Sequence, residues 1–221
     1  MNIVLDGIYD KRSLQVAKTL AKGCYGFDFR PRSFNFIQGY VLEELLNAHD
    51  LKQDDIVELH FENDSEFIIK SIIDTVEKYH PKVRLNFGLS SNHDKKILEA
   101  FNRAFSITFD EKDNLVYEKI SSPLCQSVVL NYEFLHSMAD KGLLNSFIVN
   151  FYSKVMRVKN EKFQLGIKLN WNSNISMSVI ESLDPDYLKF EINSQVERCY
   201  RNIDAPKLSE YIEYARKTLA I

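Results

Sequence analysis

The chain has 221 residues, of which 28 are Lys or Arg and 31 are Asp or Glu, so its formal net charge at pH 7 is -3. Apolar residues make up 45% and charged residues 27%, which excludes a disordered, collagenous or coiled-coil chain. A slightly acidic chain also lacks the basic surface of a dedicated nucleic-acid-binding protein.

Short apolar segments alternate with longer helical patterns along the whole chain. We predict strands at residues 1–8, 24–31, 55–63, 82–89, 105–110, 127–134, 164–171 and 187–193. We predict helices at residues 11–22, 40–47, 67–79, 95–104, 143–156, 175–183 and 208–219, with a weak segment at 113–120. The helix at 67–79 is typical, because Ile68, Ile72 and Val76 recur at helical spacing.

Nearly every predicted strand is followed by a helix, and this order predicts a parallel sheet. Eight such units in about 220 residues fit a closed (βα)8 TIM barrel. An open doubly wound sheet is the alternative, which the count of eight strands disfavours. No linker rich in Pro, Gly or Ser divides the chain, so we expect residues 1–221 to form a single domain.

Several kinds of site and location are disfavoured by what the sequence lacks. Cys24, Cys125 and Cys199 are far apart and form no C-x-x-C pair, so we expect neither a disulfide framework nor a cysteine-based zinc site. Only 7 residues are glycine, and no G-x-G-x-x-G or Walker motif occurs, which disfavours dinucleotide and P-loop chemistry. Without an apolar run of about 18 residues or a signal-like start, the chain is expected to be cytoplasmic.

The third to eighth strands alternate apolar with polar residues, whereas most buried parallel strands are continuous apolar runs. In a barrel, one parity packs beneath the helices and the other points into the lumen. Because the helices need the apolar parity, we predict that the polar parity lines the lumen. The charged or titratable residues predicted to face the lumen are Asp6, Glu58, His60, Glu62, Arg84, Asp110, Lys168, Lys189 and Glu191.

Buried charges are costly unless they are paired, so this lumen has two interpretations. One is a self-satisfied network of ion pairs. The other is a wet cavity at the carboxyl ends of the strands, where barrel enzymes carry their chemistry. Both stay open at this point.

Four segments carry a pattern in register with the predicted strands: V-L-D-G-I at 4–8, G-F-D-F-R-P-R-S at 26–33, F-E-N at 61–63 and E-I-N-S-Q-V-E at 191–197. They resemble K-I-C-G-I, G-F-x-F-x-P-x-S, F-x-N and D-V-S-S-G-V-E of phosphoribosylanthranilate isomerase, a (βα)8 enzyme of tryptophan biosynthesis. The resemblance implies an Amadori-type isomerisation of a phosphoribosyl amine, without cofactor or metal.

The sequence departs from this family at the positions that the resemblance marks as functional. Asp6 stands where the family has the Cys that acts as general base, and Asn131 where it has the Asp that acts as general acid. Asn35 stands where an Arg holds the anthranilate carboxylate. Asn170 and Asn193 stand in the two segments that are glycine-containing and cup the phosphate in the family.

A pair of aspartates offers another route to chemistry. The histidine-pathway isomerase, which is similar to this family in fold and reaction, has carboxylates at the ends of its first and fifth strands, where Asp6 and Asp110 stand here. Two carboxylates with different pKa values could serve as the acid and the base of such an isomerisation. The alternative is a structural Asp6, paired with Lys168 or Arg84.

Other polar residues are candidates for holding an anion or an ion. Arg30, Arg32 and Ser33 could bind a phosphate or carboxylate. His60 could join a metal or proton-relay cluster, but no second His stands at ligand spacing, which favours a hydrogen-bonded lumen histidine. The predicted substrate-binding residues are Arg30, Arg32, Ser33, Asn35, Arg84, Lys168, Asn170, Glu191 and Asn193.

Three functions remain open from the sequence. The first is a divergent phosphoribosylanthranilate isomerase-like protein with weak or lost parent activity. The second is a non-catalytic barrel that binds a ligand or a protein, with the pocket plugged by side chains such as Lys168, Trp171 and Glu191. The third is a sugar-phosphate isomerase of altered specificity that uses Asp6 and Asp110. We expect a small phosphorylated sugar or another anionic small molecule as partner, no nucleic acid, membrane, cofactor or metal, and a monomer or homodimer.

Overall fold

The computed structural model describes residues 1–21, 23–62, 64–89, 100–155 and 163–219. Within them, eight parallel strands pair in chain order, and the last pairs with the first, so the sheet closes into a barrel. The strands are β1 (Asn2–Asp6), β2 (Cys24–Asp28), β3 (Ile56–His60), β4 (Arg84–Leu89), β5 (Ala104–Thr108), β6 (Cys125–Asn131), β7 (Gln164–Leu169) and β8 (Tyr187–Glu191). The predicted (βα)8 barrel is confirmed.

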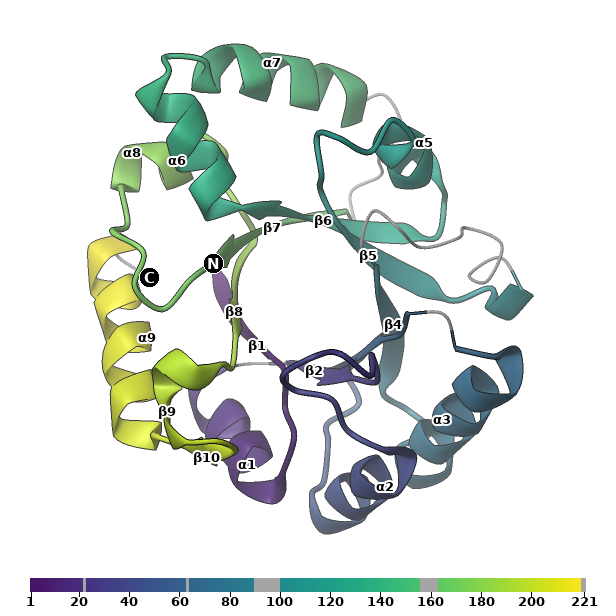
Figure 1. Cartoon of the computed structure of the whole chain (residues 1–221). Helices are drawn as coiled ribbons and strands as arrows, with labels where there is room; N and C mark the ends of the chain where they lie inside the picture. Colours follow the sequence, from purple (N-terminus) through teal and green to yellow (C-terminus); the bar gives the residue numbers. More distant parts are fainter. Residues whose placement is uncertain (22, 63, 90–99, 156–162, 220–221) are drawn as a thin grey trace.

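The helices lie in a ring around this barrel (Figure 1). They are α1 (Lys11–Leu20), α2 (Gly39–Ala48), α3 (Glu66–Tyr79), α5 (Val116–Ser121), α6 (Tyr132–Asp140), α7 (Leu144–Val155), α8 (Met177–Glu181) and α9 (Ala205–Leu219). The predicted helix at 95–104 lies mostly outside the described residues, and Ala104 itself begins β5. Among the described helices, none is long and apolar enough to cross a membrane.

The predicted sixth strand, at 127–134, was wrong at its carboxyl end. The strand ends at Asn131, and residues Tyr132–Asp140 form α6. The Asn131 side-chain oxygen accepts the Glu133 N–H at 2.9 Å and so caps the new helix. The alternation of apolar and polar residues runs on through this cap, which hid the change of structure.

A short antiparallel pair escaped the sequence analysis. After the 3-10 turn η1 (Ser194–Val196), β9 (Glu197–Cys199) pairs with β10 (Asn202–Ile203) before α9 begins. Strands of this length are too short to leave a periodic signal. In Figure 1 this hairpin lies beside α1 and α9, in the connection that follows β8.

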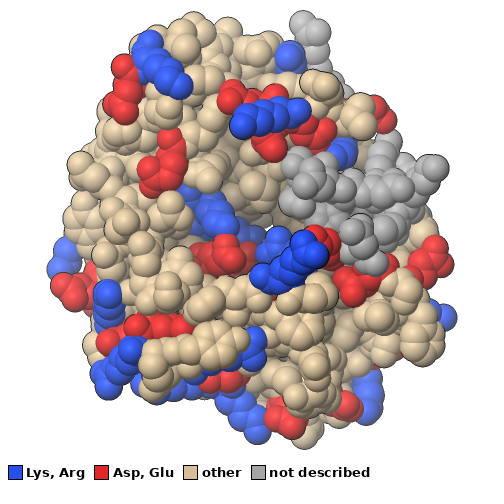
Figure 2. All heavy atoms as spheres, viewed as in Figure 1, with Lys and Arg blue, Asp and Glu red and all other residues tan. Residues whose placement is uncertain are grey.

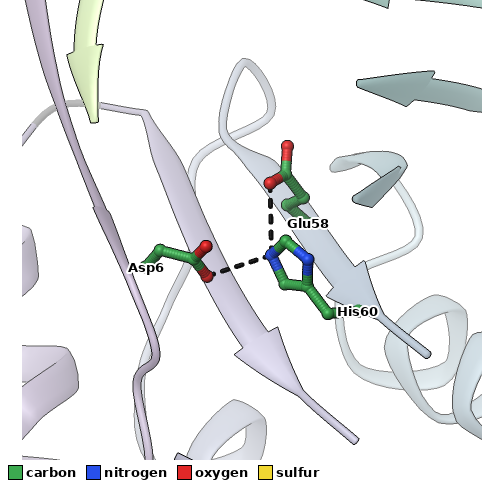
Figure 3. A group of neighbouring side chains, drawn as sticks. All are labelled: Asp6, Glu58 and His60. Atoms are coloured by element: carbon green, nitrogen blue, oxygen red, sulfur yellow. Dashed lines mark ion pairs between the residues drawn. The ribbon is translucent and has the colours of Figure 1, made fainter. Parts of the chain in front are cut away.

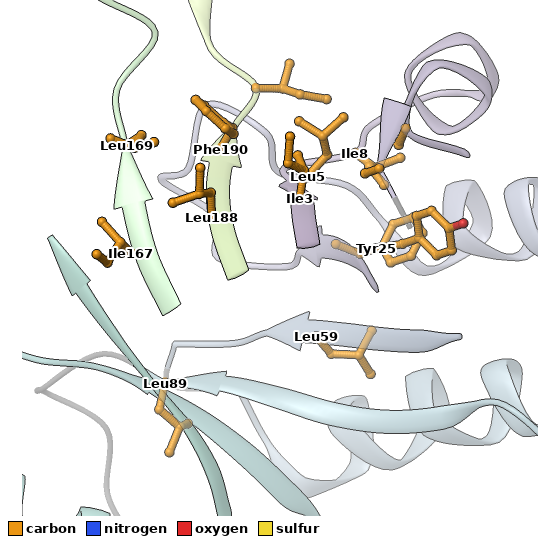
Figure 4. Close-up of a cluster of buried hydrophobic side chains, with 14 of the residues drawn as sticks. Ile3, Leu5, Ile8, Tyr25, Leu59, Leu89, Ile167, Leu169, Leu188 and Phe190 are labelled. Carbon is orange, nitrogen blue, oxygen red and sulfur yellow. The ribbon is translucent and has the colours of Figure 1, made fainter. Parts of the chain in front are cut away.

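The apolar parity of the strands forms the main core, between the sheet and the helices. Leu5, Leu59 and Leu188 are fully buried there, as are many helix residues such as Leu14 and Leu42. Figure 4 shows part of this layer, with apolar side chains from β1, β7 and β8 gathered together. Each such side chain stabilises the fold by roughly 1.5–3 kcal/mol, which fixes the opposite parity toward the lumen.

Candidate functional site

Four titratable side chains meet in the middle of the barrel: Asp6 of β1, Glu58 and His60 of β3, and Lys189 of β8. The His60 Nε2 atom lies 3.0 Å from Asp6 Oδ1 and 3.2 Å from Glu58 Oε1 (Figure 3). The Lys189 Nζ atom lies 3.0 Å from Asp6 Oδ2 and also contacts Glu58 Oε1. Because β8 and β3 are not neighbours in the sheet, the contact of Lys189 with Glu58 crosses the lumen. We call these four residues the central charge layer.

Neighbouring polar groups complete the layer. Ser106 Oγ donates to Glu58 Oε2 at 2.7 Å, and Asn86 Nδ2 donates to the same oxygen at 3.2 Å. The Gly7 N–H donates to Asp6 Oδ1 at 2.8 Å. Both carboxylates therefore have partners on each oxygen, which is the condition under which buried charges are tolerated.

The ion pairs shift the pKa values of all four residues. Burial alone would raise the pKa of Asp6, but His60 and Lys189 outweigh it and hold that pKa well below 3.8. The pKa of Glu58 is lowered in the same way, chiefly by Lys189. Burial would lower the pKa of His60, but Asp6 and Glu58 raise it to about 9, and the same two carboxylates raise the pKa of Lys189. At neutral pH the layer thus holds two negative and two positive charges.

Glycines on the inward parity make room for these large side chains. A Cβ atom on Gly26 would lie 1.9 Å from Asp6 Oδ1, and one on Gly88 would lie 2.1 Å from His60 Cε1. A Cβ atom on Gly166 would lie 2.4 Å from the Tyr187 ring. Three of the seven glycines of this chain therefore stand where a larger residue would collide with a lumen side chain.

The central charge layer also contains a combination of atoms that can hold a metal ion. One ligand atom from each of Asp6, Glu58 and His60 lies within 4.8 Å of the others. However, the Lys189 ammonium touches both carboxylates, and His60 is protonated at neutral pH. A divalent cation would have to displace the Lys189 ammonium, which already contacts both carboxylates, so the arrangement described here is that of an ion-pair network.

At the carboxyl rim of the barrel, a second ion pair joins Lys168 of β7 to Glu191 of β8. The fully buried Trp171 donates its indole N–H to the Glu191 carbonyl oxygen at 2.7 Å and stacks on Phe190. Figure 2 shows charged side chains of both signs gathered around a hollow at the centre of the face drawn. The rim charges are thus partly neutralised by each other.

This chain matches known proteins by its three-dimensional structure and not by its sequence. No known protein-family model and no curated protein sequence matches this chain. Among solved structures, phosphoribosylanthranilate isomerase from Thermus thermophilus covers 99% of this chain and 100% of its own, at 15% identity and a TM-score of 0.64. A monomeric form of the dimeric Thermotoga maritima enzyme covers 98% of this chain and 98% of its own, at 15% identity and a TM-score of 0.67. TrpF from Jonesia denitrificans covers 100% of this chain and 98% of its own, at 14% identity and a TM-score of 0.63.

The chain has the fold of the phosphoribosylanthranilate isomerases. Its whole length takes part in the match, from β1 to α9. Structural matches at sequence identities this low show a shared fold, and they do not show a shared activity.

The residue at the position of the isomerase base is not paired as predicted. Asp6 contacts His60 and Lys189, whereas Lys168 pairs with Glu191 and Arg84 lies at the other end of the barrel. Arg84 begins β4, is exposed, and donates from Nη2 to the Asp54 carbonyl oxygen at 3.0 Å. It therefore faces away from the carboxyl ends, where the isomerase fold carries its chemistry.

Asp110 and Asn131, the other two candidates for catalysis, line one cavity of about 360 Å³ near the ends of β5 and β6. Asp6 does not line this cavity. The Asp110 carboxylate accepts the Lys112 N–H at 2.9 Å, and Asn131 caps α6. The structure thus brings Asp110 near Asn131 but places Asp6 in a different environment.

The loop after β2 is held by its own side chains. Arg30 forms an ion pair with Asp28 at 2.5 Å, and Ser33 Oγ accepts the Asn35 N–H at 3.2 Å, while Arg32 is exposed. Asn35, at the position of the isomerase carboxylate anchor, is fully buried and donates to the Ile192 carbonyl oxygen at 2.6 Å. It ties this loop to the end of β8.

The two positions that stand for the isomerase phosphate site also make local bonds. The Asn170 N–H donates to Ser173 Oγ at 3.2 Å, and the Asn193 side-chain oxygen accepts the Gln195 N–H at 2.9 Å. What the sequence analysis missed is that Lys189 and Glu58 form the centre of the network. The inward glycines, which stand opposite large polar residues, were the signal for it.

Proposed function

We propose that this chain is a phosphoribosylanthranilate isomerase-like barrel that has lost efficient parent catalysis and acts by binding. The observation that carries the proposal is the state of Asp6. One of its oxygens contacts His60 and the Gly7 N–H, and the other contacts Lys189.

A general base must be free to accept a proton and needs a pKa near the working pH. The pKa of Asp6 is instead held well below its ordinary value, so its carboxylate is a weak base that is already occupied. At the position of the acid, an amide replaces the carboxyl group, and the oxygen of Asn131 caps a helix. The two positions at which the resemblance places the base and the acid therefore hold no suitable group.

The anionic ligand implied by the resemblance belongs to the carboxyl rim. One solved isomerase, 14% identical over 98% of this chain, is in complex with reduced 1-(o-carboxyphenylamino)-1-deoxyribulose 5-phosphate. In this chain Lys168 would meet such a phosphorylated sugar after parting from Glu191. Arg30 and Arg32, in the loop after β2, are the other basic residues that we propose for this ligand. A small anionic molecule is therefore the ligand class that we propose for this face.

The test is turnover of phosphoribosylanthranilate by the purified protein, measured beside Asp6→Asn and Asp110→Asn. We expect the native chain to show the background rate, with both variants indistinguishable from it. Turnover that Asp6→Asn abolishes and Asp110→Asn leaves intact would contradict the proposal and establish a carboxylate base. Loss of turnover in both variants would point to the two-aspartate isomerase.

A further inference from the structure

We propose that the amino end of the barrel holds a second binding site, for a small uncharged polyhydroxy molecule such as a free sugar or polyol. A cavity of about 260 Å³ lies among the first residues of the strands. Its innermost walls are Glu58 and Lys189, so it reaches the central charge layer from the side opposite the carboxyl rim. The proposal does not depend on the loss of isomerase activity, because the parent chemistry belongs to the other end.

The lining of this cavity mixes polar side chains with apolar ones such as Val4 and Ile56, and most of the polar ones stand at inward positions of the strands. Gln164 and Asn2 stand at the starts of β7 and β1 and are exposed at the mouth. Deeper, Ser127 and Tyr187 are buried, and the Tyr187 hydroxyl donates to Ser127 Oγ at 3.2 Å. Side-chain amides and hydroxyls both donate and accept hydrogen bonds, as the hydroxyl groups of a sugar do.

One buried acceptor in the wall has no partner. Asn86 is 8% exposed, and its Nδ2 is used by Glu58, whereas its Oδ1 accepts no hydrogen bond from any described residue. A buried polar atom left without a partner is costly, and of the six such atoms among the described residues Asn86 Oδ1 is the one whose residue lines this cavity. A hydroxyl or N–H group of a molecule in the cavity would satisfy it.

Charge and size define the molecule further. Glu58 and Lys189 pair with each other at the floor, and at the mouth Arg84 lies beside the acidic Asp54, whose carbonyl oxygen it binds. With one acid and one base at each level, the cavity attracts neither anions nor cations strongly. A volume of about 260 Å³ far exceeds the ~30 Å³ of one water and lies just below the roughly 300–1,000 Å³ of drug-sized sites. The site therefore suits a small neutral molecule.

The experiment is saturation-transfer NMR on the full chain, with D-ribose and xylitol as neutral probes and ribose 5-phosphate as the charged probe. Gln164→Trp places a large ring at the mouth, and Asn86→Leu removes the unpaired acceptor. Gln53→Trp is the matched control, since Gln53 is exposed before β3 and does not line the cavity. Thermal unfolding of each variant verifies that it is folded.

We expect saturation transfer to at least one neutral probe, reduced about tenfold or more in Gln164→Trp and in Asn86→Leu and unchanged in Gln53→Trp. If Asn86→Leu does not fold, Gln164→Trp decides alone. Three results would overturn the proposal: transfer to neither neutral probe, which means a cavity holding water only; transfer that Gln164→Trp leaves unchanged; and transfer to ribose 5-phosphate alone. Turnover of phosphoribosylanthranilate is a separate readout and does not bear on these outcomes.

Discussion

Lys189 supplies one of the two positive charges that neutralise Asp6 and Glu58 in the middle of the barrel. Its ammonium touches both carboxylates, and its side chain is only 8% exposed. Removal of Lys189 would leave two buried carboxylates without their lysine partner, and an uncompensated buried carboxylate is very unfavourable.

We expect Lys189→Met to lower the free energy of unfolding by about 3–5 kcal/mol, measured by urea denaturation at pH 7. Lys168→Met is the matched control, because the Lys168–Glu191 pair is about one-third exposed and should contribute only about 0–1 kcal/mol. Equal effects of the two substitutions would show that the ion pairs of Lys189 stabilise the fold no more than the Lys168–Glu191 pair does.

His60 gives stability an unusual dependence on alkaline pH. Its pKa rises from 6.5 to about 9 on folding, so its contribution is full below pH 6.5 and is lost as the pH rises through 9. A shift of this size corresponds to about 3 kcal/mol. Urea denaturation from pH 6 to 10 should show this decline, and His60→Gln should flatten it. A native profile that is level from pH 6.5 to 9 would mean that His60 is neutral in the fold.

The acid side of the same profile has the opposite sign. The pKa values of Asp6 and Glu58 are lowered on folding from 3.8 and 4.5, so their contributions are present above those values and are lost as the pH falls. Maximum stability is therefore expected between about pH 5 and 6.5, where all four charges are present in the layer.

At the scale of the elements, the strands depend on glycines that face large side chains across the lumen. Gly88→Ala would bring a Cβ atom to 2.1 Å from the His60 ring, and Gly26→Ala would bring one to 1.9 Å from Asp6 Oδ1. We expect each substitution to lower the unfolding free energy by about 1–3 kcal/mol in urea denaturation.

The control for these substitutions is Gly39→Ala, at the first residue of α2. There the new Cβ atom would meet only the flexible end of Ile72 at 3.0 Å, and alanine favours the helix. We expect a change of less than about 1 kcal/mol. A cost at Gly88 as small as the one expected at Gly39 would show that the lumen has room for an extra methyl group.

More of the fold than of the site could be predicted from the sequence. The order of the eight barrel strands was readable because most of them alternate apolar with polar residues and are followed by a periodic helix, whereas α6 and the β9–β10 hairpin were missed. The parity of Glu58 and Lys189 was readable too, and it placed both in the lumen. Their pairing was not readable, because 131 residues separate them and the stagger of the strands decides which inward residues share a layer.

The burial of Asn35 could not be predicted for a similar reason. Its partner is the carbonyl oxygen of Ile192, which lies 157 residues away and has no side-chain signal in the sequence. Asn35 was predicted to bind substrate only because the resemblance places it at the isomerase carboxylate anchor. Only the approach of the second loop to the end of β8 makes it a tether.

The molecule as a whole is closed by its first and last strands. β1 and β8 pair along their full length, from Asn2 with Tyr187 to Asp6 with Glu191. Because every strand then has two neighbours, no described strand of the barrel can separate without breaking the ring.

We therefore expect one cooperative unfolding transition for residues 1–221. The chain has a single Trp, Trp171, which is buried, so its fluorescence reports one place beside β8, whereas far-ultraviolet circular dichroism reports all helices and strands. The two signals should have the same midpoint in urea. Midpoints that differ reproducibly would show that the chain consists of more than one folding unit.

The central charge layer has one more consequence, for how the protein can change over time. It separates the carboxyl rim of the barrel, where Lys168 pairs with Glu191, from the cavity at the amino end, whose mouth holds Gln164 and Arg84. Substitutions that are well separated and share no partner act independently on stability. Residues of the rim and of the cavity mouth that do not contact this layer can therefore change independently, so a single barrel of this kind can acquire a new binding property at one end without loss at the other.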